Sequence, residues 1–244
     1  TWINDKTAFV LSPHFPLQSE SFNDHTEDKK VEWFFENLLP EGGMREAMAR
    51  KRNLHTRDIF GLLSNFGEEL AGALSLLYEE DSFPQQQLYL PISTEDLRQM
   101  ILESSDSSLM VANEKLHMSL AGVQNKIAVK YKNNKFFLPQ GAAASSHILK
   151  PDNNNSDFEF CPANEYFCMC LARALDLNVP DVELLHIPEP VYLIKRYDRL
   201  FEAGYIKRLH QIDLCQLLNK WEGYKYESYG GISLEDVFSS VNQL

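Results

Sequence analysis

Cysteine is scarce in this sequence, and the few cysteines present show no pairing pattern. The chain has four of them, Cys161, Cys168, Cys170 and Cys215. They form no Cys-x-x-Cys pair and no zinc-ligand spacing, so the sequence supports neither a disulfide framework nor a metal site. A reducing cytoplasm is the compartment that fits this usage best.

Long apolar runs and a cationic leader are also missing. No stretch reaches the length that a bilayer requires, and no basic segment followed by an apolar one opens the chain. The sequence therefore predicts neither a membrane span nor a secretory signal. It begins at Thr1 rather than at methionine, which indicates a processed or truncated chain.

Positively charged residues are fewer than negatively charged ones. The 244 residues contain 23 lysines and arginines against 35 aspartates and glutamates, which gives a formal net charge of −12 and a pI of about 5.0. This balance argues against broad binding of nucleic acid or of an acidic membrane. A local basic patch around Arg45, Arg50, Lys51 and Arg52 stays open, although a solvated helix face explains these residues more simply.

The remaining composition is typical of a globular protein. Hydrophobic residues make up 44% of the chain and charged residues 24%, and the length allows one large or two smaller domains. There are no internal repeats. The run 104–108, rich in serine and aspartate, is the best candidate for a domain boundary, because helical patterns precede it and strand patterns follow it.

The first part of the chain has the periodicity of several short helices. The first helix would begin at Thr26 and carry one apolar stripe, made of Val31, Phe34, Phe35, Leu38 and Leu39. Its end would be marked by Pro40, Gly42 and Gly43. Further helices are expected over residues 44–52, 56–67 and 93–103, the last opened by a capping-box-like Ser93 and Asp96. The alternating stretch 70–78 predicts a strand, and 79–87 predicts a loop.

The second part combines strands with a few helices. The expected strands are 126–131, 135–138, 147–150, 182–187 and 192–197, the first two joined as a hairpin by Lys132-Asn133-Asn134. A helix from Pro162 would bury one apolar side, made of Phe167, Cys168, Leu171, Ala172, Ala174 and Leu175. Helices near 213–218 and 233–241 would follow.

Three features in this second part follow one another in an order that indicates a nucleotide-phosphate site. The loop 119–126 is small and turn-prone, a strand-like run ends in Lys150, and the helix from Pro162 carries Glu165 early. Such a loop can cradle phosphates with its backbone, a strand lysine can hold them as a point charge, and a helix glutamate can hold the lysine. Taken singly, the loop and the lysine are explained more simply by an ordinary hairpin and a surface lysine, and the glutamate by a carboxylate that the helix dipole favours.

Protein kinases have these elements in this order, followed by a hinge strand. Here the hinge would be the strand that ends at Lys195-Arg196-Tyr197-Asp198-Arg199. The charged residues Arg196, Asp198 and Arg199 can equally be a structural charge cluster, and this alternative stays open.

Six motifs carry a resemblance to a known family. They are Ser119-Leu120-Ala121-Gly122-Val123-Gln124-Asn125-Lys126, Ser146-His147-Ile148-Leu149-Lys150-Pro151, Asn164-Glu165-Tyr166-Phe167-Cys168, Leu177-Asn178-Val179-Pro180, Arg196-Tyr197-Asp198-Arg199 and Arg208-Leu209-His210-Gln211-Ile212-Asp213-Leu214-Cys215-Gln216. The match continues at 225–227 and 230–231, and Trp2 with the segments 11–18 and 37–40 resembles the amino-terminal subdomain of the same family. With these motifs the sequence resembles the HipA family over nearly its whole length.

The resemblance implies an α+β fold. It would combine a protein-kinase-like small lobe, built from an antiparallel sheet and one helix, with a mainly helical amino-terminal subdomain and the start of a helical large lobe. The corresponding boundaries are 1–105 for the amino-terminal subdomain, 106–199 for the ATP-binding small lobe and 200–244 for the start of the large lobe.

The resemblance also implies an activity and partners. HipA proteins are serine/threonine kinases that act as toxins of bacterial toxin–antitoxin pairs, and a DNA-binding HipB partner inhibits them. The implied ligands are ATP and Mg²⁺, and the implied substrate is a translation-related protein such as glutamyl-tRNA synthetase, whose phosphorylation favours persistence. DNA would be met only through the antitoxin.

Site residues follow from the resemblance position by position. The ATP phosphates would be contacted by Ala121, Gly122, Val123, Gln124, Asn125 and Lys126. Lys150 would be the phosphate-binding lysine, Glu165 its positioning partner, and the hinge of Lys195, Arg196 and Tyr197 would offer backbone groups to adenine. Ser119 would be autophosphorylated, and the added charge would remodel the loop and switch the kinase off.

Two residues depart from the family pattern. Asn125 stands where glutamate is usual, which puts the salt bridging of the loop in doubt. Lys195 stands where glutamate is common, and backbone contacts to adenine tolerate this change.

The groups that complete a kinase are not found after the hinge. His210 and Asp213 form the one His-to-Asp neighbourhood there, but it lies too close to the hinge, and Leu218 stands where a magnesium-binding asparagine would fall. We therefore expect a fragment, incomplete at both ends, that lacks the catalytic aspartate and the Mg²⁺ ligands and is inactive alone. The alternative is a non-catalytic module that engages a HipB-like antitoxin or a kinase partner.

Overall fold

The computed structural model describes residues 8–17, 21–24, 29–77, 87–104, 122, 124–152, 159–202 and 204–242. By its internal contacts the chain divides into two compact units. One consists of Thr1–Leu39 and His210–Leu244, and the other of Pro40–Leu209. The boundaries expected near residues 105 and 199 stay a prediction.

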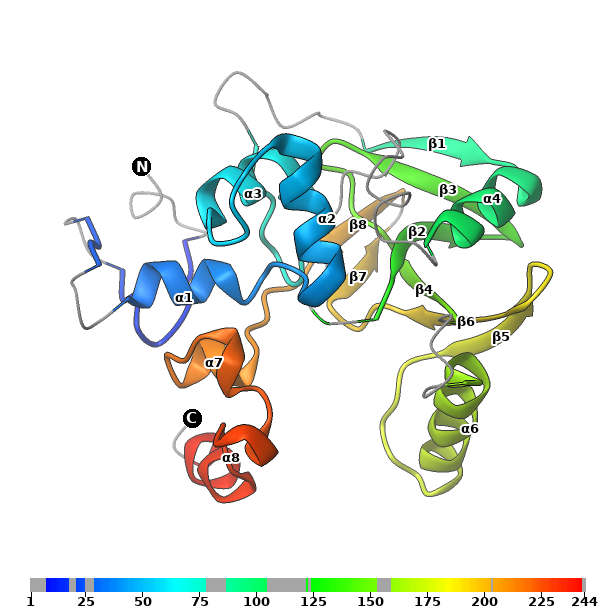
Figure 1. Cartoon of the computed structure of the whole chain (residues 1–244). Helices are drawn as coiled ribbons and strands as arrows, with labels where there is room; N and C mark the ends of the chain where they lie inside the picture. The colour runs from blue at the N-terminus through cyan, green and yellow to red at the C-terminus, as the bar shows by residue number, and fades with distance from the viewer. Residues whose placement is uncertain are drawn as a thin grey trace. The chain divides into compact units, whose positions relative to one another are not determined.

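A six-stranded antiparallel sheet is the main element of the unit Pro40–Leu209 (Figure 1). Its strands stand in the order β1-β3-β2-β4-β6-β5, and every neighbouring pair is antiparallel. Their bounds are Leu88–Ile92 for β1, Ile127–Lys132 for β2, Lys135–Gln140 for β3, His147–Pro151 for β4, Val182–His186 for β5 and Pro190–Lys195 for β6. The mixture of this sheet with several helices confirms the expected α+β class.

The β2–β3 hairpin confirms one turn prediction in detail. Lys132 pairs with Lys135, so that Asn133 and Asn134 are the two turn residues. Both have positive φ, 52° and 58°. Two left-handed residues in a row are typical of a type I′ turn, which matches the twist of a hairpin and which asparagine tolerates better than most residues.

Helix α4 (Thr94–Ser104) covers one face of the sheet (Figure 1). The buried core there consists of Leu97, Met100, Ile101, Ile127, Val129, Leu138, Leu149, Ile187, Val191 and Leu193. The strand residues among them recur with the period of two that directs alternate side chains to one face. The helix begins as expected, since the Ser93 hydroxyl accepts a hydrogen bond from the Asp96 N–H at 3.0 Å.

Helix α6 (Cys161–Ala174) packs against β5 and β6 on the sheet (Figure 1). Pro162 lies in its first turn as expected and is its buried residue. The predicted buried side is wrong: Phe167 is 64% exposed and Leu171 49%, and Leu175, just after the helix, is exposed as well. The face of the helix that packs on β5 and β6 therefore does not coincide with the apolar stripe.

Helices α2 (Gly42–Arg52) and α3 (Ile59–Phe66) lie where short helices were expected. Two details need correction. Gly42 begins α2 instead of ending the helix before it, and Asp58 rather than Thr56 caps α3, because its carboxylate accepts a hydrogen bond from Gly61 N at 2.8 Å. Arg45, expected on a solvated face, is buried, and its Nε donates to the Thr56 carbonyl at 2.8 Å.

The strand predicted over 70–78 is wrong for residues 70–77, which form no strand. Gly72 has a φ of 71°. Its N–H donates to the Asp198 carboxylate and its carbonyl accepts from Arg199. Backbone groups that are bonded to side chains in this way are not available to a sheet ladder.

Three further strands were not predicted from the sequence. Strand β1 contains Pro91, which lacks an N–H and is tolerated because, among the described strands, β1 lies at the edge of the sheet and pairs with β3 alone. The strands β7 (Arg199–Glu202) and β8 (Tyr205–Arg208) form a separate two-stranded hairpin. Each has only four residues, too few for a clear periodicity.

In the unit Thr1–Leu39 and His210–Leu244, helix α1 (Lys30–Glu36) contacts α7 (Leu214–Leu217). The Gln216 side-chain amide donates to the Phe34 carbonyl at 2.9 Å. Helix α1 ends earlier than expected, and Leu38 and Leu39 are buried in the turn that follows. Its expected cap, Thr26, lies outside the described residues.

The last part of this unit contains two 3₁₀ turns, η3 (Glu222–Tyr224) and η4 (Glu227–Tyr229), and helix α8 (Leu234–Val241). The helices expected near 213–218 and 233–241 are both present, each opened by a capping box, Asp213 with Gln216 and Ser233 with Asp236. His210 Nε2 lies 2.7 Å from the Leu11 carbonyl. The His-to-Asp neighbourhood of the sequence thus consists of a backbone-bound histidine and a helix cap.

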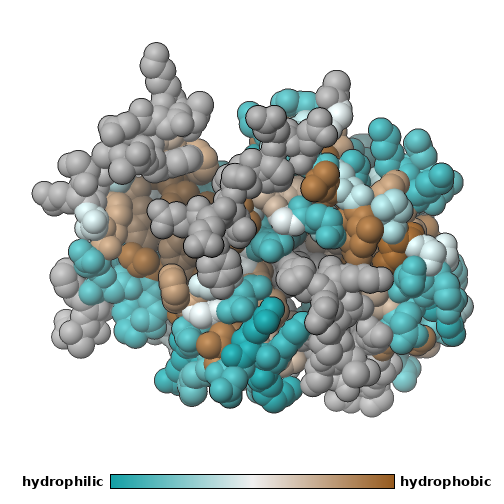
Figure 2. Space-filling view, turned by 90° about the horizontal axis from the view of Figure 1, so that it is seen from above, coloured by the Kyte–Doolittle hydropathy of each residue, from teal (hydrophilic) through white to brown (hydrophobic). Residues whose placement is uncertain are grey.

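On the face shown in Figure 2, hydrophilic and apolar residues both reach the surface. Within the described ranges, no helix has both the length and the apolarity needed to cross a membrane.

Candidate functional site

The structure brings together the lysine and the glutamate that the sequence indicated. Lys150 lies on β4 and Glu165 in the second turn of α6, and the Lys150 Nζ lies 2.5 Å from Glu165 Oε2. Their side chains are 20% and 30% exposed. The pair therefore joins the sheet to the helix while the ammonium group stays within reach of a ligand.

The ring of Tyr192 lies next to this lysine. It is directly opposite Lys150 in the β4–β6 register, and the Lys150 Nζ lies 5.6 Å from the centroid of its ring. Tyr192 is almost fully buried, and this burial, with the nearby charge of Glu165, raises the pKa of its hydroxyl to about 12. An aromatic ring beside an ammonium group attracts it electrostatically and helps to hold it in place.

The loop of the proposed phosphate site is described only in part, at Gly122 and from Gln124 onward. Gly122 has a φ of 111°, and a Cβ at this position would come within 2.5 Å of the Lys126 Nζ. The backbone conformation therefore favours glycine, whereas the flexible Lys126 side chain could move away from a Cβ. The Gly122 carbonyl accepts a hydrogen bond from Glu41 N at 3.3 Å, which fixes one end of the loop.

The sheet register brings the other end of this loop beside Lys150. Ile127 pairs with Leu149 in the antiparallel β2–β4 ladder, so Lys126 and Lys150 continue the same register by one residue. Gln124 Nε2 is buried and has no hydrogen-bond partner in the described part of the chain. Ammonium groups and amide donors are the kinds of group that bind a polyphosphate.

Three residues of the predicted site fall outside the described residues. These are Ala121, Val123 and the predicted autophosphorylation site, Ser119. Their assignments stay predictions.

The hinge segment lies at the end of β6. The Lys195 N–H donates to the Asp181 carbonyl and the Arg196 N–H to the Ser146 carbonyl, both at 2.9 Å. The Tyr197 side chain is 71% exposed. The side chain of Arg196 turns inward, so a nucleotide contact of this residue would involve its backbone.

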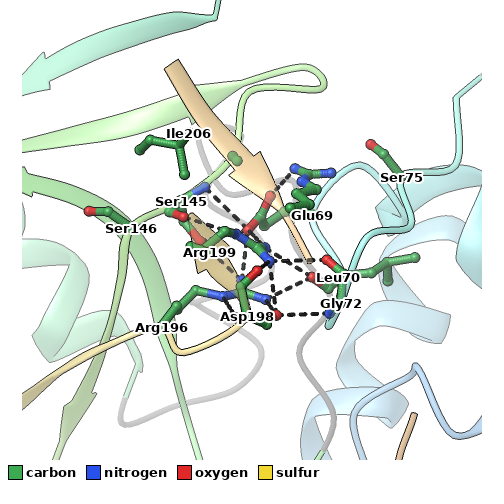
Figure 3. A network of polar contacts seen from close by, with 12 residues as sticks. Glu69, Leu70, Gly72, Ser75, Ser145, Ser146, Arg196, Asp198, Arg199 and Ile206 are labelled. Carbon is green, nitrogen blue, oxygen red and sulfur yellow. Dashed lines mark hydrogen bonds and ion pairs between the residues drawn. The ribbon is translucent and has the colours of Figure 1, made fainter. Parts of the chain in front are cut away.

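Arg196 enters a buried network of charged groups that the sequence did not predict in full (Figure 3). Glu69 binds three arginines: its Oε1 accepts from Arg196 Nη1 at 2.7 Å and from Arg199 Nη2 at 2.8 Å, and its Oε2 accepts from Arg208 Nη2. The Ser145 hydroxyl also donates to Oε1, at 2.6 Å. Glu69 is therefore the shared acceptor of the network.

Asp198 is the second carboxylate of this network. Arg196 donates to it through Nε at 2.9 Å and Nη2 at 2.6 Å, and Arg199 donates through Nη1 at 2.8 Å. The N–H of Gly72 completes the set at 2.8 Å. For the side chains of Arg196, Asp198 and Arg199, the structure thus supports the structural charge cluster that the sequence left open.

The network fixes the charge state of its members. Burial favours the neutral form of Glu69, but the arginines outweigh it, with Arg208 first, and hold the pKa of this carboxyl below its usual value. The pKa of Asp198 is lowered in the same way, since the hydrogen bonds from Arg196 outweigh burial. Burial and the neighbouring Arg196 lower the pKa of Arg199 to about 10, which still leaves it charged at neutral pH.

Sequence reasoning missed Glu69 and Arg208 as members of this network. Glu69 lies 127 positions before Arg196, and no local pattern links the two. Within the described residues, no group of three histidine, cysteine, aspartate or glutamate side chains is placed to hold a metal ion.

Comparison with known families gives two matches that together cover most of the chain. Residues 118–244 match the HipA-like C-terminal domain, and residues 1–77 match the HipA N-terminal domain.

Comparison with individual proteins agrees with these matches. The chain is 32% identical to the Sinorhizobium fredii protein named "Putative kinase Y4mE" over 251 residues, which cover 100% of this chain and 58% of that protein. It is 28% identical to the serine/threonine-protein kinase toxin HipA of Shewanella oneidensis over 242 residues, 97% of this chain and 54% of the toxin.

Among solved structures, the HipA–HipB–operator DNA complex of the Shewanella oneidensis toxin–antitoxin system contains a similar chain. The TM-score is 0.72 at 28% sequence identity, and the match covers 94% of this chain and 52% of that one. The chain thus spans about half the length of the relatives it matches.

Proposed function

The chain belongs to the HipA family, and from this membership and the geometry around Lys150 we propose that it carries the nucleotide-binding part of a serine/threonine kinase. The Lys150–Glu165 ion pair is the observation that carries the proposal. In a kinase, a strand lysine held by a helix glutamate binds the phosphates of ATP.

The residues of this chain would bind and orient ATP. Lys150 and Lys126 would hold its phosphates as point charges, with the amides of the loop Ala121–Lys126 around them. The backbone of Lys195 and Tyr197 would receive the adenine. ATP would supply the γ-phosphoryl group, whose transfer to a serine hydroxyl also needs an aspartate and Mg²⁺ ligands that we predict to lie outside residues 1–244.

For the parent protein we propose the role of a toxin in a toxin–antitoxin pair. Support comes from the Shewanella oneidensis relative, which is named a kinase toxin and was solved with HipB and operator DNA. The partner of this chain would be a HipB-like DNA-binding antitoxin, and its substrate a translation-related protein such as an aminoacyl-tRNA synthetase. Ser119 would be the site of autophosphorylation that switches the kinase off.

Titration calorimetry with ATP tests the nucleotide site. Lys150→Ala should weaken ATP binding by about tenfold or more, since the charge that holds the phosphates is lost. Lys135→Ala, which removes an exposed lysine on the same sheet, is the matched control and should leave the affinity unchanged. Unchanged ATP affinity in a folded Lys150→Ala protein would remove Lys150 from the site.

Intact-mass and peptide mass spectrometry test the proposed off-switch. After incubation of the full parent protein with MgATP, phosphate should be found on Ser119 and should be absent from Ser119→Ala. Phosphorylation of Ser119 by residues 1–244 alone would contradict the prediction that the catalytic aspartate lies outside them.

A further inference from the structure

Glu69 comes from a different part of the sequence than the three arginines that it binds. It falls within the segment 1–77 that matches the N-terminal domain of the family. Its partners Arg196, Arg199 and Arg208 fall within the segment 118–244 that matches the C-terminal domain. One carboxylate of the first segment therefore ties together three side chains of the second (Figure 3).

Arg196 connects this carboxylate to the hinge. Its guanidinium donates to Glu69, Ser145, Asp198 and the Leu70 carbonyl, so that all five of its N–H groups are used. Because the planar guanidinium is held at so many points, the backbone of Arg196 has little freedom to move. The residues on either side of Arg196 are the two whose backbone the proposed function assigns to adenine.

The charge balance makes Glu69 hard to replace. Three guanidinium groups face two carboxylates, which gives the network a formal charge of 3 − 2 = +1, and all five side chains are at most 9% exposed. Neutralising Glu69 would raise this charge to +2. Asp198 already accepts four hydrogen bonds, about the capacity of a carboxylate, and has no site left for the arginines that would be released. Like charges at this burial repel strongly, so Arg196 would shift and carry the hinge with it.

We propose that Glu69 is a positioning residue for the nucleotide. It sets the place of the hinge through Arg196, and thereby the affinity for adenine, without touching the nucleotide itself. The inference rests on the proposed function, because it is there that the hinge backbone receives adenine. It gives the N-terminal domain of the family a part in nucleotide recognition.

A comparison of two ligands tests the proposal. Inorganic tripolyphosphate offers the phosphates of ATP without adenine, so it needs Lys150 and the loop but not the hinge. Calorimetry with both ligands should show that Glu69→Gln weakens ATP binding by about tenfold or more and leaves tripolyphosphate binding unchanged. Glu69→Asp keeps the charge and should restore part of the ATP affinity. Glu68→Gln, a change in the neighbouring carboxylate outside the network, is the control and should bind both ligands normally.

Each other outcome contradicts the proposal. An equal loss for both ligands would show a general structural role, and unchanged ATP binding by a folded Glu69→Gln protein would show no role. If circular dichroism shows that Glu69→Gln does not fold, Ser145→Ala is the variant to test instead. It removes one donor to Glu69 and should weaken ATP binding by about threefold without changing tripolyphosphate binding. The inference is overturned if Ser145→Ala does not lose ATP affinity selectively over tripolyphosphate affinity.

The two proposals fail in different ways. If the unaltered chain binds neither ligand, or Lys150→Ala binds ATP normally, the proposed function is wrong and this inference falls with it. If Lys150→Ala loses both ligands while Glu69→Gln keeps ATP, only the inference is wrong.

Discussion

The Lys150 ammonium group of β4 and the Glu165 carboxylate of α6 form an ion pair at 2.5 Å, across the boundary between the sheet and its helix. Both side chains are partly exposed. An ion pair in such a position contributes little to stability, since solvent screens it. Its effect is to hold the lysine in one direction, which is what a phosphate-binding lysine needs.

The first prediction concerns this positioning. Glu165→Gln leaves Lys150 charged but releases it, so we expect calorimetry to show weaker ATP binding, with a smaller loss than for Lys150→Ala. The double variant should bind no more weakly than Lys150→Ala alone, because the glutamate acts only through the lysine. Additive losses would show that Glu165 acts on the nucleotide by another route.

The second prediction concerns the β2–β3 turn. Asn133→Val places a β-branched residue at a φ of 52°, and we expect the free energy of unfolding to fall by about 1–2 kcal/mol. Asn133→Gly is the matched control and should be neutral, because glycine adopts positive φ without strain. Urea denaturation measures both, and equal stability of the two variants would contradict the turn assignment.

The third prediction concerns the pH dependence of stability. Burial lowers the pKa of His147 to about 4, and the positive charge of Lys195 adds to this against a smaller opposite effect of Asp181. The ring lies 2.7 Å from the Ser146 hydroxyl and edge-on to Tyr131. Between pH 4 and the usual pKa near 6.5, the unfolded chain binds more protons than the folded one, so stability falls as the pH falls through this window.

Replacing the histidine should remove that dependence. In urea denaturation across this range, His147→Gln should lose stability less steeply than the unaltered chain on acidification. Each pKa unit of such a shift corresponds to about 1.4 kcal/mol, reduced here because the ring stays partly in contact with solvent. His186→Gln, a change of an exposed histidine on β5, is the control. An unchanged slope in His147→Gln would show that another group causes the acid sensitivity.

The sequence predicted those parts of the fold that depend on local chemistry. The asparagine turn, the capping box of Ser93 and the alternation of β2 and β4 each depend on a few consecutive residues. The pairing of Lys150 with Glu165 was also predicted, because both residues lie in motifs that the family shares.

What the sequence did not reveal depends on contacts between distant residues. Residues 70–77 alternate like a strand, but the backbone of Gly72 within them binds Asp198 and Arg199 instead. Nothing near Glu69 indicates that it meets three arginines more than 120 positions later. The apolar stripe of α6 suggested a buried side, yet only the packing against β5 and β6 decides which face is covered.

If the loop 122–126, Lys150 and the hinge bind one nucleotide, their amide groups should respond to it together. In an NMR titration with a non-hydrolysable ATP analogue, we expect the amide signals of residues 122–126, Lys150 and 195–197 to shift with one dissociation constant, while those of α8 stay in place. Saturation by the analogue without shifts in these three segments would contradict this prediction.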